Sequence, residues 1–586
     1  MTCSRPAAGN SPRSAGPLNS GPRASGLAAW APWILILAGS LIYANSFSTP
    51  LVFDAQKYIT GNPSLDLLWP WRYTMARNRP VGFFTFALNH LCQPTGVWGY
   101  HAVNLAIHLA AGLLLYGLVR RTLSRPPLAA RYGPAAVGLA LAAALIWLVH
   151  PLQTQSVTYV YQRLESLMGL FYLATLYGFV RAQNSPKPWL WYALSVACCA
   201  LGMGTKEVMV TAPLAVLFYD RTLASPSWAS LFARRWPYYL ALSFTWAILA
   251  SLMKGDWANY EANGVVTVPG ATPLGYALTQ PGVILHYLRL AFWPSGQCID
   301  YAWPLAAGFW RIVPQAAAVL ALLALTAWCV WRRPAWGFVL GCFFLILAPT
   351  SSVVPVVDPA FEHRMYLPLA PVAIVVALAG YELTRRWLPP PWQTVCRVAL
   401  LCAAAAALGM ATFERNRVYA DEIMLWSDVI QASPANARAF ANRGVLRAGG
   451  KDYAGALADY NRSLALNPTL AETFNNRAML LASAPDEHFR NGKQAVADAR
   501  QACKMTGWQR ADILDTLAAA YAETGDFEQA VIWQQKAIQQ AADNPPFVKE
   551  AQERLQLYRN RQPFRERRTG DRDSVVPCPS GSKMLP

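Results

Sequence analysis

Long apolar runs separated by short polar segments occupy the first two thirds of the chain. The first run covers 27–47. Further runs lie at 99–119, 134–149, 164–180, 188–203, 207–220, 237–253, 312–331, 335–349, 365–384 and 396–413. Most are near the ~20 residues that a helix needs to cross a bilayer. We therefore predict an all-α fold whose first part, 27–413, is a multispanning membrane domain of about eleven helices.

Basic residues gather in alternate loops between these runs. The clusters are Arg120, Arg121, Arg125 and Arg131, then Arg181 and Lys187, then Arg221, Arg234 and Arg235, then Arg332 and Arg333, and finally Arg385, Arg386 and Arg397. By the positive-inside rule these loops face the cytoplasm. The alternation then requires that 254–311 stays outside, with the short stretch 282–293 not crossing. Every unusually polar loop consequently falls on the outer side.

Composition supports a membrane protein with a soluble part. Hydrophobic residues make up 54% of the chain and charged residues 14%, below the ~25% of soluble domains. The net charge of +18 does not indicate nucleic-acid binding, because the cations flank apolar runs. The 11 cysteines show no metal-ligand spacing, so no metal site is predicted. Residues 1–26 and 559–586 are predicted to be disordered tails, the first cytoplasmic and the second basic.

The segment 414–558 has a helical repeat. Phe440, Gly444, Ala456, Tyr460 and Pro468 match the 34-residue tetratricopeptide pattern, and related units begin near Ala471 and Ala511. A helix over 420–432 is predicted to cap the array on the membrane side. Stacked pairs of this kind form an α-solenoid with a concave surface that suits an extended peptide. By the same parity the array lies outside.

The first outer loop, Leu51–Leu65, carries Asp54, the first acidic residue of the chain. A carboxylate just after a membrane helix is either an ordinary loop anion or the base of an enzyme at the membrane surface. The residue alone favours the first interpretation.

Other outer loops carry polar clusters with similar alternatives. Arg163, beside Gln162 and Glu165, is a phosphate ligand or an interfacial anchor. Lys206 and Glu207 stand in a tight bend, where a charged pair is costly unless it binds something. Glu362, His363 and Arg364 suit a phosphate head group, and no partner histidine supports a metal. Asp300 contacts a sugar or caps a turn, and His101 lies near the outer end of its helix.

In this order, VFDAQKYITGNPSL, RPVGFFTFALNH, YHAVNLAIH, HPLQTQSVTYVYQRLES, GMGTKEVMV, CIDYAWP and EHRMYLPL, followed by tetratricopeptide repeats, resemble the bacterial relatives of the transmembrane-and-tetratricopeptide O-mannosyltransferases. The resemblance covers roughly 27–541. It implies a GT-C glycosyltransferase fold that uses a polyprenyl-phosphate sugar as donor, with no certain cofactor. Ala55 stands where the family often has a second acid.

The resemblance implies roles for individual residues. Asp54 matches the catalytic base, and Arg163, Lys206, His363 and Arg364 match a donor-phosphate site. The supporting polar residues are Gln162, Glu165, Glu207, Asp300, Glu362 and His101. The expected reaction moves a hexose to Ser or Thr of an exported polypeptide held by the repeats, in the bacterial inner membrane with the site on the periplasmic side. The alternatives are a lipid or glycan acceptor, or a non-enzymatic membrane-anchored scaffold.

Overall fold

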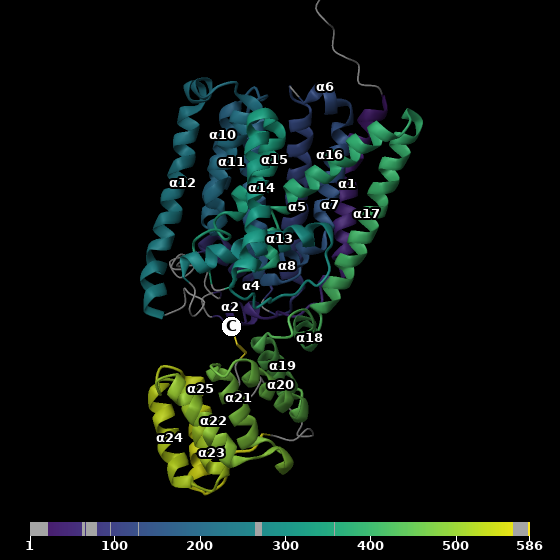
Figure 1. The fold of residues 1–586 in the computed structure, drawn as a ribbon. Helices are drawn as coiled ribbons and strands as arrows, with labels where there is room; N and C mark the ends of the chain where they lie inside the picture. The colour runs from purple at the N-terminus through teal and green to yellow at the C-terminus, as the bar shows by residue number, and fades with distance from the viewer. Residues whose placement is uncertain are drawn as a thin grey trace, which may run out of the picture.

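The computed structural model describes residues 22–60, 62, 65, 79–93, 95–126, 128–263, 272–356, 358–566 and 584–585. Within these ranges all regular secondary structure is helical. Figure 1 shows two bodies joined end to end, a tall helix bundle and a smaller helical solenoid. The predicted class, an all-α membrane domain followed by an α-solenoid, is confirmed.

The bundle follows the predicted apolar runs. Its main helices are α1 (Pro22–Ile42), α5 (Trp98–Leu123), α7 (Ala136–Leu148), α9 (Arg163–Ala182), α10 (Pro188–Met203), α11 (Ala212–Tyr219), α12 (Trp228–Asn263), α14 (Phe309–Arg332), α15 (Pro334–Leu347), α16 (Leu369–Trp387) and α17 (Pro390–Val418). Five helical segments in the described residues, those that contain α1, α5, α7, α14 and α17, are long and apolar enough to cross a membrane. Two more, α10 and α15, are apolar but shorter. The count of about eleven spans stays a prediction.

Short elements gather at the two ends of the bundle. At one end lie α6 (Ala129–Tyr132), η3 (Gly133–Ala135) and the π-helical turn η7 (Asp220–Ala224). At the end that faces the solenoid lie η1 (Ala44–Ser46), α2 (Asp54–Tyr58), α4 (Pro80–Cys92), η4 (Pro151–Gln153), α8 (Thr154–Val157), η5 (Val160–Gln162), η6 (Glu207–Thr211), α13 (Pro273–Phe292) and η8 (Glu362–Met365). In Figure 1, α13 lies at this end of the bundle. This place agrees with the prediction that 282–293 does not cross, although the helix begins earlier.

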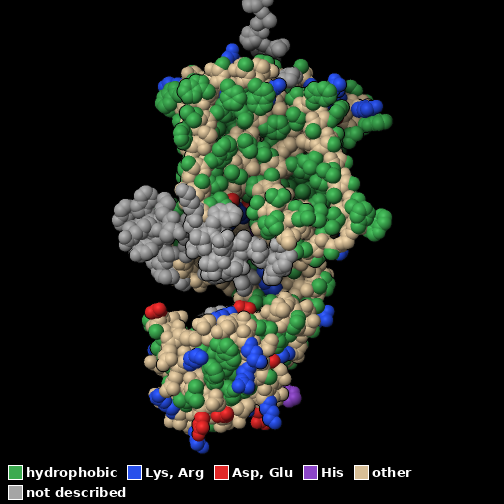
Figure 2. Space-filling view, turned by 60° about the vertical axis from the view of Figure 1, so that its left-hand side comes forward, with side chains coloured by type: hydrophobic (Ala, Val, Ile, Leu, Met, Phe, Trp, Pro, Cys, Tyr) green, Lys and Arg blue, Asp and Glu red, His purple; other side chains and the backbone are tan. Residues whose placement is uncertain are grey.

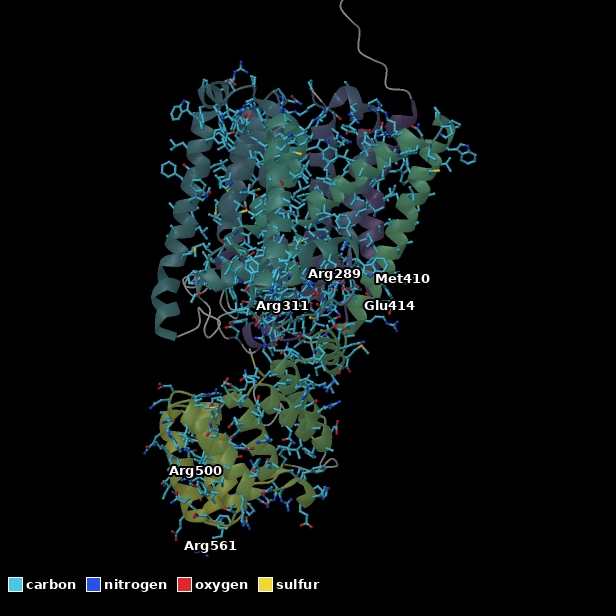
Figure 3. The ribbon with its side chains drawn as sticks, viewed as in Figure 1. Arg289, Arg311, Met410, Glu414, Arg500 and Arg561 are labelled. Atoms are coloured by element: carbon cyan, nitrogen blue, oxygen red, sulfur yellow. The ribbon has the colours of Figure 1, made fainter. Side chains whose placement is uncertain are left out.

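The bundle surface is that of a membrane protein. Figure 2 shows hydrophobic side chains over its flank and Lys and Arg along its upper edge, away from the solenoid. On α17 the surface changes within one turn from Met410, which is 65% exposed, to the exposed Glu414. Figure 3 shows Glu414 at about the level of Arg289 and Arg311. The apolar band therefore ends just above the polar loops.

Several polar groups buried inside the bundle are paired, as a low-dielectric interior favours. The buried His108 contacts the hydroxyl of Tyr366 at 3.0 Å and the carbonyl of Leu148 at 3.0 Å. The indole of Trp147 donates to the carbonyl of Tyr366 at 2.8 Å. These contacts tie α5 and α7 to the start of α16.

The solenoid begins after α17. Its elements are α18 (Glu422–Ala432), α19 (Ala437–Gly449), α20 (Tyr453–Leu466), α21 (Ala471–Ser483), η9 (Glu487–Phe489), α22 (Gly492–Met505), α23 (Ala511–Glu523), α24 (Phe527–Gln540) and α25 (Pro545–Arg559). Within the first pair, Gly444 lets α19 approach α20, since a Cβ there would lie 2.7 Å from the ring of Tyr460. The close helix pairing expected from the small residues is thus present, and helix α18 occupies the predicted capping segment.

The membrane domain begins and ends several residues away from its predicted boundaries, and part of the predicted C-terminal tail is ordered against the solenoid. Helix α1 already begins at Pro22, and α17 continues to Val418. After α25 the chain turns back along the solenoid, where the amide of Glu566 donates to the carbonyl of Ser483 at 2.9 Å. The aromatic ring of Phe564 packs on the solenoid core because it is apolar. The rest of the two predicted tails, 1–21 and 567–583, lies outside the described residues.

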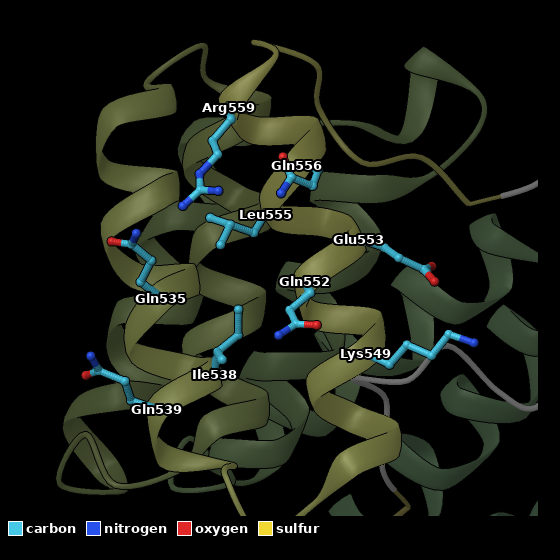
Figure 4. A pocket seen from close by; sticks show the side chains of 9 residues that line it. All are labelled: Gln535, Ile538, Gln539, Lys549, Gln552, Glu553, Leu555, Gln556 and Arg559. Atoms are coloured by element: carbon cyan, nitrogen blue, oxygen red, sulfur yellow. The ribbon is translucent and has the colours of Figure 1, made fainter.

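A groove of about 680 Å³ lies between α24 and α25. Figure 4 shows carboxamide side chains along both of its walls, with Ile538 and Leu555 between them. None of the residues singled out in the sequence lines this groove. The candidate site is instead the set of polar loops where the bundle meets the solenoid.

Candidate functional site

Asp54 is the first residue of the short helix α2, immediately outside the bundle. Its backbone amide donates to the hydroxyl of Tyr159 at 3.0 Å. The same hydroxyl is hydrogen-bonded to the Asp54 carboxylate, and burial together with this carboxylate raises the pKa of Tyr159. Because the phenol stays protonated, it can hold the carboxylate in place while Asp54 remains only partly buried.

The backbone before Asp54 is strained. Phe53 has φ +53°, in the left-handed region that a residue with a Cβ seldom adopts. Its ring packs edge-on against Trp426 of α18, with centroids 5.5 Å apart, and Trp426 is 1% exposed. Three residues after Phe53, the side-chain amide of Gln56 donates to the carboxylate of Glu422 at 2.6 Å. The first solenoid helix therefore clamps the loop that carries Asp54.

The contacts that begin at Asp54 and Tyr159 continue through η5. At the end of η5, Gln162 lies 3.5 Å from the ammonium of Lys206, measured to the Gln162 side-chain oxygen. Lys206 forms a buried ion pair with Glu165 at 2.6 Å. Three of the predicted residues thus meet, and η5 connects them to Tyr159 and Asp54.

Lys206 and Glu207 are not paired with each other. Glu207 instead accepts hydrogen bonds from the guanidinium of Arg79, with N–O distances of 2.9 to 3.2 Å. Each charge of the tight bend therefore has its own partner, Glu165 for Lys206 and Arg79 for Glu207. Arg79 was not singled out from the sequence, although it is the first residue of the quoted motif RPVGFFTFALNH.

The structure uses Arg163 for helix packing. Its guanidinium donates to the side chain of Asn104 at 2.6 Å and to the carbonyls of Tyr100 and Thr85 at 2.9 and 3.2 Å. It also lies over the ring of Phe86 at 4.6 Å, and its exposed fraction is 0%. Because backbone and ring contacts surround this cation, direct phosphate contact, which the sequence suggested, does not fit its position.

His363 lies deep in the same region. Its backbone amide donates to the side-chain oxygen of Gln155 at 2.7 Å, and its ring Nδ1 lies 2.9 Å from that oxygen. Nδ1 therefore carries the proton, and Nε2 keeps a lone pair. Burial lowers the pKa of His363 well below its usual value, and the cations Lys206, Arg364 and Arg79 lower it further. A neutral ring with a free lone pair is a hydrogen-bond acceptor and not the phosphate ligand that the sequence suggested.

Arg364 is partly exposed and donates to the carbonyls of Asp358 and Pro359 at 2.6 and 2.7 Å. Among the described residues no carboxylate lies within ion-pair distance of it. Its positive charge therefore has no direct acidic partner in the part of the chain that the structure describes. Of the predicted phosphate ligands, Arg364 and Lys206 keep this capacity.

Glu362 and Asp300 have structural contacts. Glu362 accepts from the amide of Cys298 at 2.6 Å, from the hydroxyl of Tyr301 at 2.7 Å and from Gln297 at 3.0 Å. Asp300 caps its turn by accepting from the amide of Ala302 at 3.1 Å. This is one of the two roles that the sequence suggested for it. Its carboxylate also pairs with Arg438 of the solenoid at 2.7 Å.

Arg438 joins the two bodies. It also contacts Asp358 at 3.1 Å, and the neighbouring Asn436 donates to Asp300 at 3.0 Å. Burial by itself raises the pKa of Asp300, but Arg438 and Asn436 hold it below its usual range. His101 likewise supports the loop, since its Nε2 lies 2.9 Å from the carbonyl of Thr49, just before Asp54. No motif in the sequence connected Arg438 with Asp300.

Among the described residues no group of three or more His, Cys, Asp or Glu side chains is arranged to hold a metal ion. The polar cluster contains an acidic residue at the surface, a buried Lys–Glu pair and a guanidinium that has no acidic partner within the described ranges. This set provides a proton acceptor and two cations for an anionic leaving group.

Glu422 gives a prediction for pH dependence. Burial raises its pKa to about 7, so the folded protein binds a proton that the unfolded chain has lost above its own lower pKa. Stability from this group is present at acidic pH and is lost as the pH rises through about 7. Glu422→Gln is expected to remove that loss while keeping the acceptor for Gln56. Melting temperatures at pH 5.5 and 8 would test this: the gain of the variant over wild type should be larger at pH 8 than at pH 5.5.

The family and the curated proteins that this chain matches are mannosyltransferases. The dolichyl-phosphate-mannose-protein mannosyltransferase family matches residues 79–253. The protein O-mannosyl-transferase Tmtc3 of Drosophila melanogaster is 26% identical over 489 residues, which is 70% of this chain and 52% of that protein. The protein O-mannosyl-transferase F38B6.6 of Caenorhabditis elegans is 23% identical over 432 residues, 70% of this chain and 59% of that protein.

Human TMTC4, also a protein O-mannosyl-transferase, is 28% identical over 211 residues, which is 30% of this chain and 28% of that protein. No solved structure matches significantly. The chain spans about half the length of the curated relatives that it matches most extensively. The matched segment includes Arg79, Arg163, Lys206 and Glu207 of the polar cluster. The chain is thus a relative of the TMTC protein O-mannosyl-transferases and, with them, of the GT-C glycosyltransferases.

Proposed function

We propose that the protein is a membrane glycosyltransferase that moves a hexose, mannose in its relatives' names, from a polyprenyl-phosphate donor to Ser or Thr hydroxyls of an exported polypeptide. The observation that carries the proposal is the continuous set of contacts from Asp54 through Tyr159 and η5 to Lys206. Through these contacts the proposed proton acceptor is linked to a buried cation at the end of the bundle that faces the solenoid. The matches to protein O-mannosyl-transferases support the same reaction class.

In the proposed step, Asp54 takes the proton of the acceptor hydroxyl as its oxygen attacks the anomeric carbon of the sugar. The bond between that carbon and the phosphate oxygen breaks, and the polyprenyl phosphate leaves with the negative charge. Lys206 and Arg364 neutralise this charge, which is the largest that develops in the transition state. The configuration at the anomeric carbon is inverted.

The proposed orientation puts the site and the solenoid outside the cytoplasm, in the periplasm of a bacterial inner membrane. The Lys and Arg side chains at the opposite end of the bundle support it. A polyprenyl donor would then reach the site sideways from the outer leaflet. The tetratricopeptide-like solenoid would hold the acceptor and raise its local concentration.

The test is mass spectrometry of exported proteins from cells with the gene, without it, and with the Asp54→Asn gene. Hexose on Ser or Thr is expected only with the wild-type gene. Modification of lipids or glycans instead of proteins would replace the acceptor in the proposal. Unchanged glycosylation of proteins, lipids and glycans in all three strains would leave only the scaffold alternative.

A further inference from the structure

The solenoid holds a segment of its own chain by the backbone. The amide of Leu585 donates to the side-chain oxygen of Asn442 at 2.6 Å, and the Asn442 amide group donates to the carbonyl of Leu585 at 3.1 Å. One carboxamide therefore binds both polar groups of a single residue's backbone, as a neighbouring β-strand would. Such a contact reads no side chain, because every residue except proline offers the same pair of groups.

The seat of this segment is buried. Leu585 is 5% exposed and Asn442 is fully buried beneath it. The side chain of Met584 packs on the cluster of Val445, Tyr460 and Leu480, which comes from α19, α20 and α21. Two residues outside the helix pairs thus occupy a built position on the solenoid and not a loose surface contact.

The same residue type recurs one repeat further along. Asn476 stands 34 residues after Asn442, at the same position of α21 as Asn442 has in α19, and it is 1% exposed. Leu480 belongs to the cluster on which Met584 packs, and it lies one turn beyond Asn476 on the same face of α21. A polypeptide that runs along the stacked first helices would meet a carboxamide at each of these two helices.

The position at Asn442 lies close to the candidate site. Arg438 precedes Asn442 by one turn, about 5.4 Å along the helix, on the same face of α19. Arg438 contacts Asp358, whose carbonyl accepts from Arg364. A chain that leaves Asn442 toward the bundle therefore arrives at the loop that carries Arg364.

We propose that Asn442 and Asn476 bind the backbone of an extended polypeptide, and that Met584 and Leu585 occupy the first of these positions as an internal competitor. This inference rests on the proposed function for the identity of the polypeptide as sugar acceptor. It specifies the acceptor class as an unfolded segment, since a folded one has no free backbone groups.

The probe is a fluorescent synthetic peptide with the sequence of residues 579–586, and the protein is the membrane-embedded chain in nanodiscs. The chain that ends at Lys583 should bind the probe several-fold more tightly than the full chain, because the tethered competitor is gone. In this shortened chain Asn442→Ala should weaken binding by about tenfold. Asn461→Ala, an exposed asparagine of α20, is the matched control and should leave binding unchanged.

Two altered peptides keep the test valid if Asn442→Ala disturbs folding. A peptide N-methylated at the residue corresponding to Leu585 lacks the donor and should bind about as weakly as the unmodified probe binds Asn442→Ala. A peptide of scrambled order keeps the backbone groups but loses the packing of the Met584 and Leu585 side chains. It should bind the shortened chain more weakly than the original peptide, and still more tightly than it binds the Asn442→Ala variant. Equal binding by the full and shortened chains, full affinity of the methylated peptide, or equal binding of the scrambled peptide with and without Asn442 would each overturn the proposal.

Binding does not require sugar transfer, so the two proposals fail separately. If the shortened chain binds the probe as described but glycosylates no polypeptide, the proposed function is wrong. The assignment of Asn442 and Asn476 as backbone-binding residues then stands. If transfer occurs but the binding results are negative, the acceptor is held elsewhere.

Discussion

Asp54→Asn is expected to lower the turnover number of sugar transfer by about 10²- to 10⁴-fold, the usual contribution of a general base. The carboxamide has the shape of the carboxylate and can still accept from Tyr159, but it cannot take up the proton of the acceptor hydroxyl. Donor affinity should change little, because Asp54 is not among the groups assigned to the phosphate. Initial rates with a radiolabelled polyprenyl-phosphate mannose would separate the two effects.

The matched control is Asp543→Asn, the same change at an exposed position of the solenoid. Both variants should melt near the wild-type temperature. Undiminished turnover of Asp54→Asn would remove the base from the proposed mechanism. A loss that appears equally in Asp543→Asn would point to a general defect.

Replacement of Arg438 by Met should have the largest effect on stability. The change leaves Asp300 and Asp358 without their shared cation, and the Asp300 side chain is 1% exposed. Removal of one partner of a buried ion pair costs about 3–5 kcal/mol. The melting temperature in detergent should fall accordingly, with the solenoid losing its fixed position on the bundle.

The loss should depend on pH in a defined direction. Arg438 keeps the pKa of Asp300 below its usual range, so its stabilising effect is present at neutral pH and disappears as acid protonates the carboxylate. The variant should therefore differ most from wild type at neutral pH and least near pH ~4, where the orphaned carboxylates are neutral. Arg417→Met, which removes an exposed ion pair with Glu414, is the control and should cost at most about 1 kcal/mol. Equal effects of the two variants would show that Arg438 is not a joint.

Much of the candidate site was visible in the sequence because its residues lie in short motifs at helix ends. Glu165 and Lys206 were singled out for this reason, and they form an ion pair in the structure. Their partners were not predictable in the same way. The contact of Gln56 with Glu422 joins residues 366 positions apart, and no local pattern carries such information.

The motif residues also differ in what they do. The sequence left two alternatives for each of two residues: Arg163 as a phosphate ligand or an interfacial anchor, and Asp300 as a sugar contact or the cap of a turn. In the structure the cost of Arg163 is met by two backbone carbonyls, an amide and aromatic rings, and that of Asp300 by Arg438. Lone charges in a sequence therefore indicate that a partner exists but not whether it is protein or ligand.

By itself the sequence determined the class of the protein, because bilayer thickness fixes the length of apolar runs and close helix packing fixes the small residues of the repeats. It also predicted which loops lie together at one end of the bundle. Only the tertiary structure decided which charges meet, that α18 clamps the loop of Asp54, and that Asn442 holds a backbone. These contacts form between segments brought together by folding, where distance in space and burial, and not order along the chain, set the interaction energy.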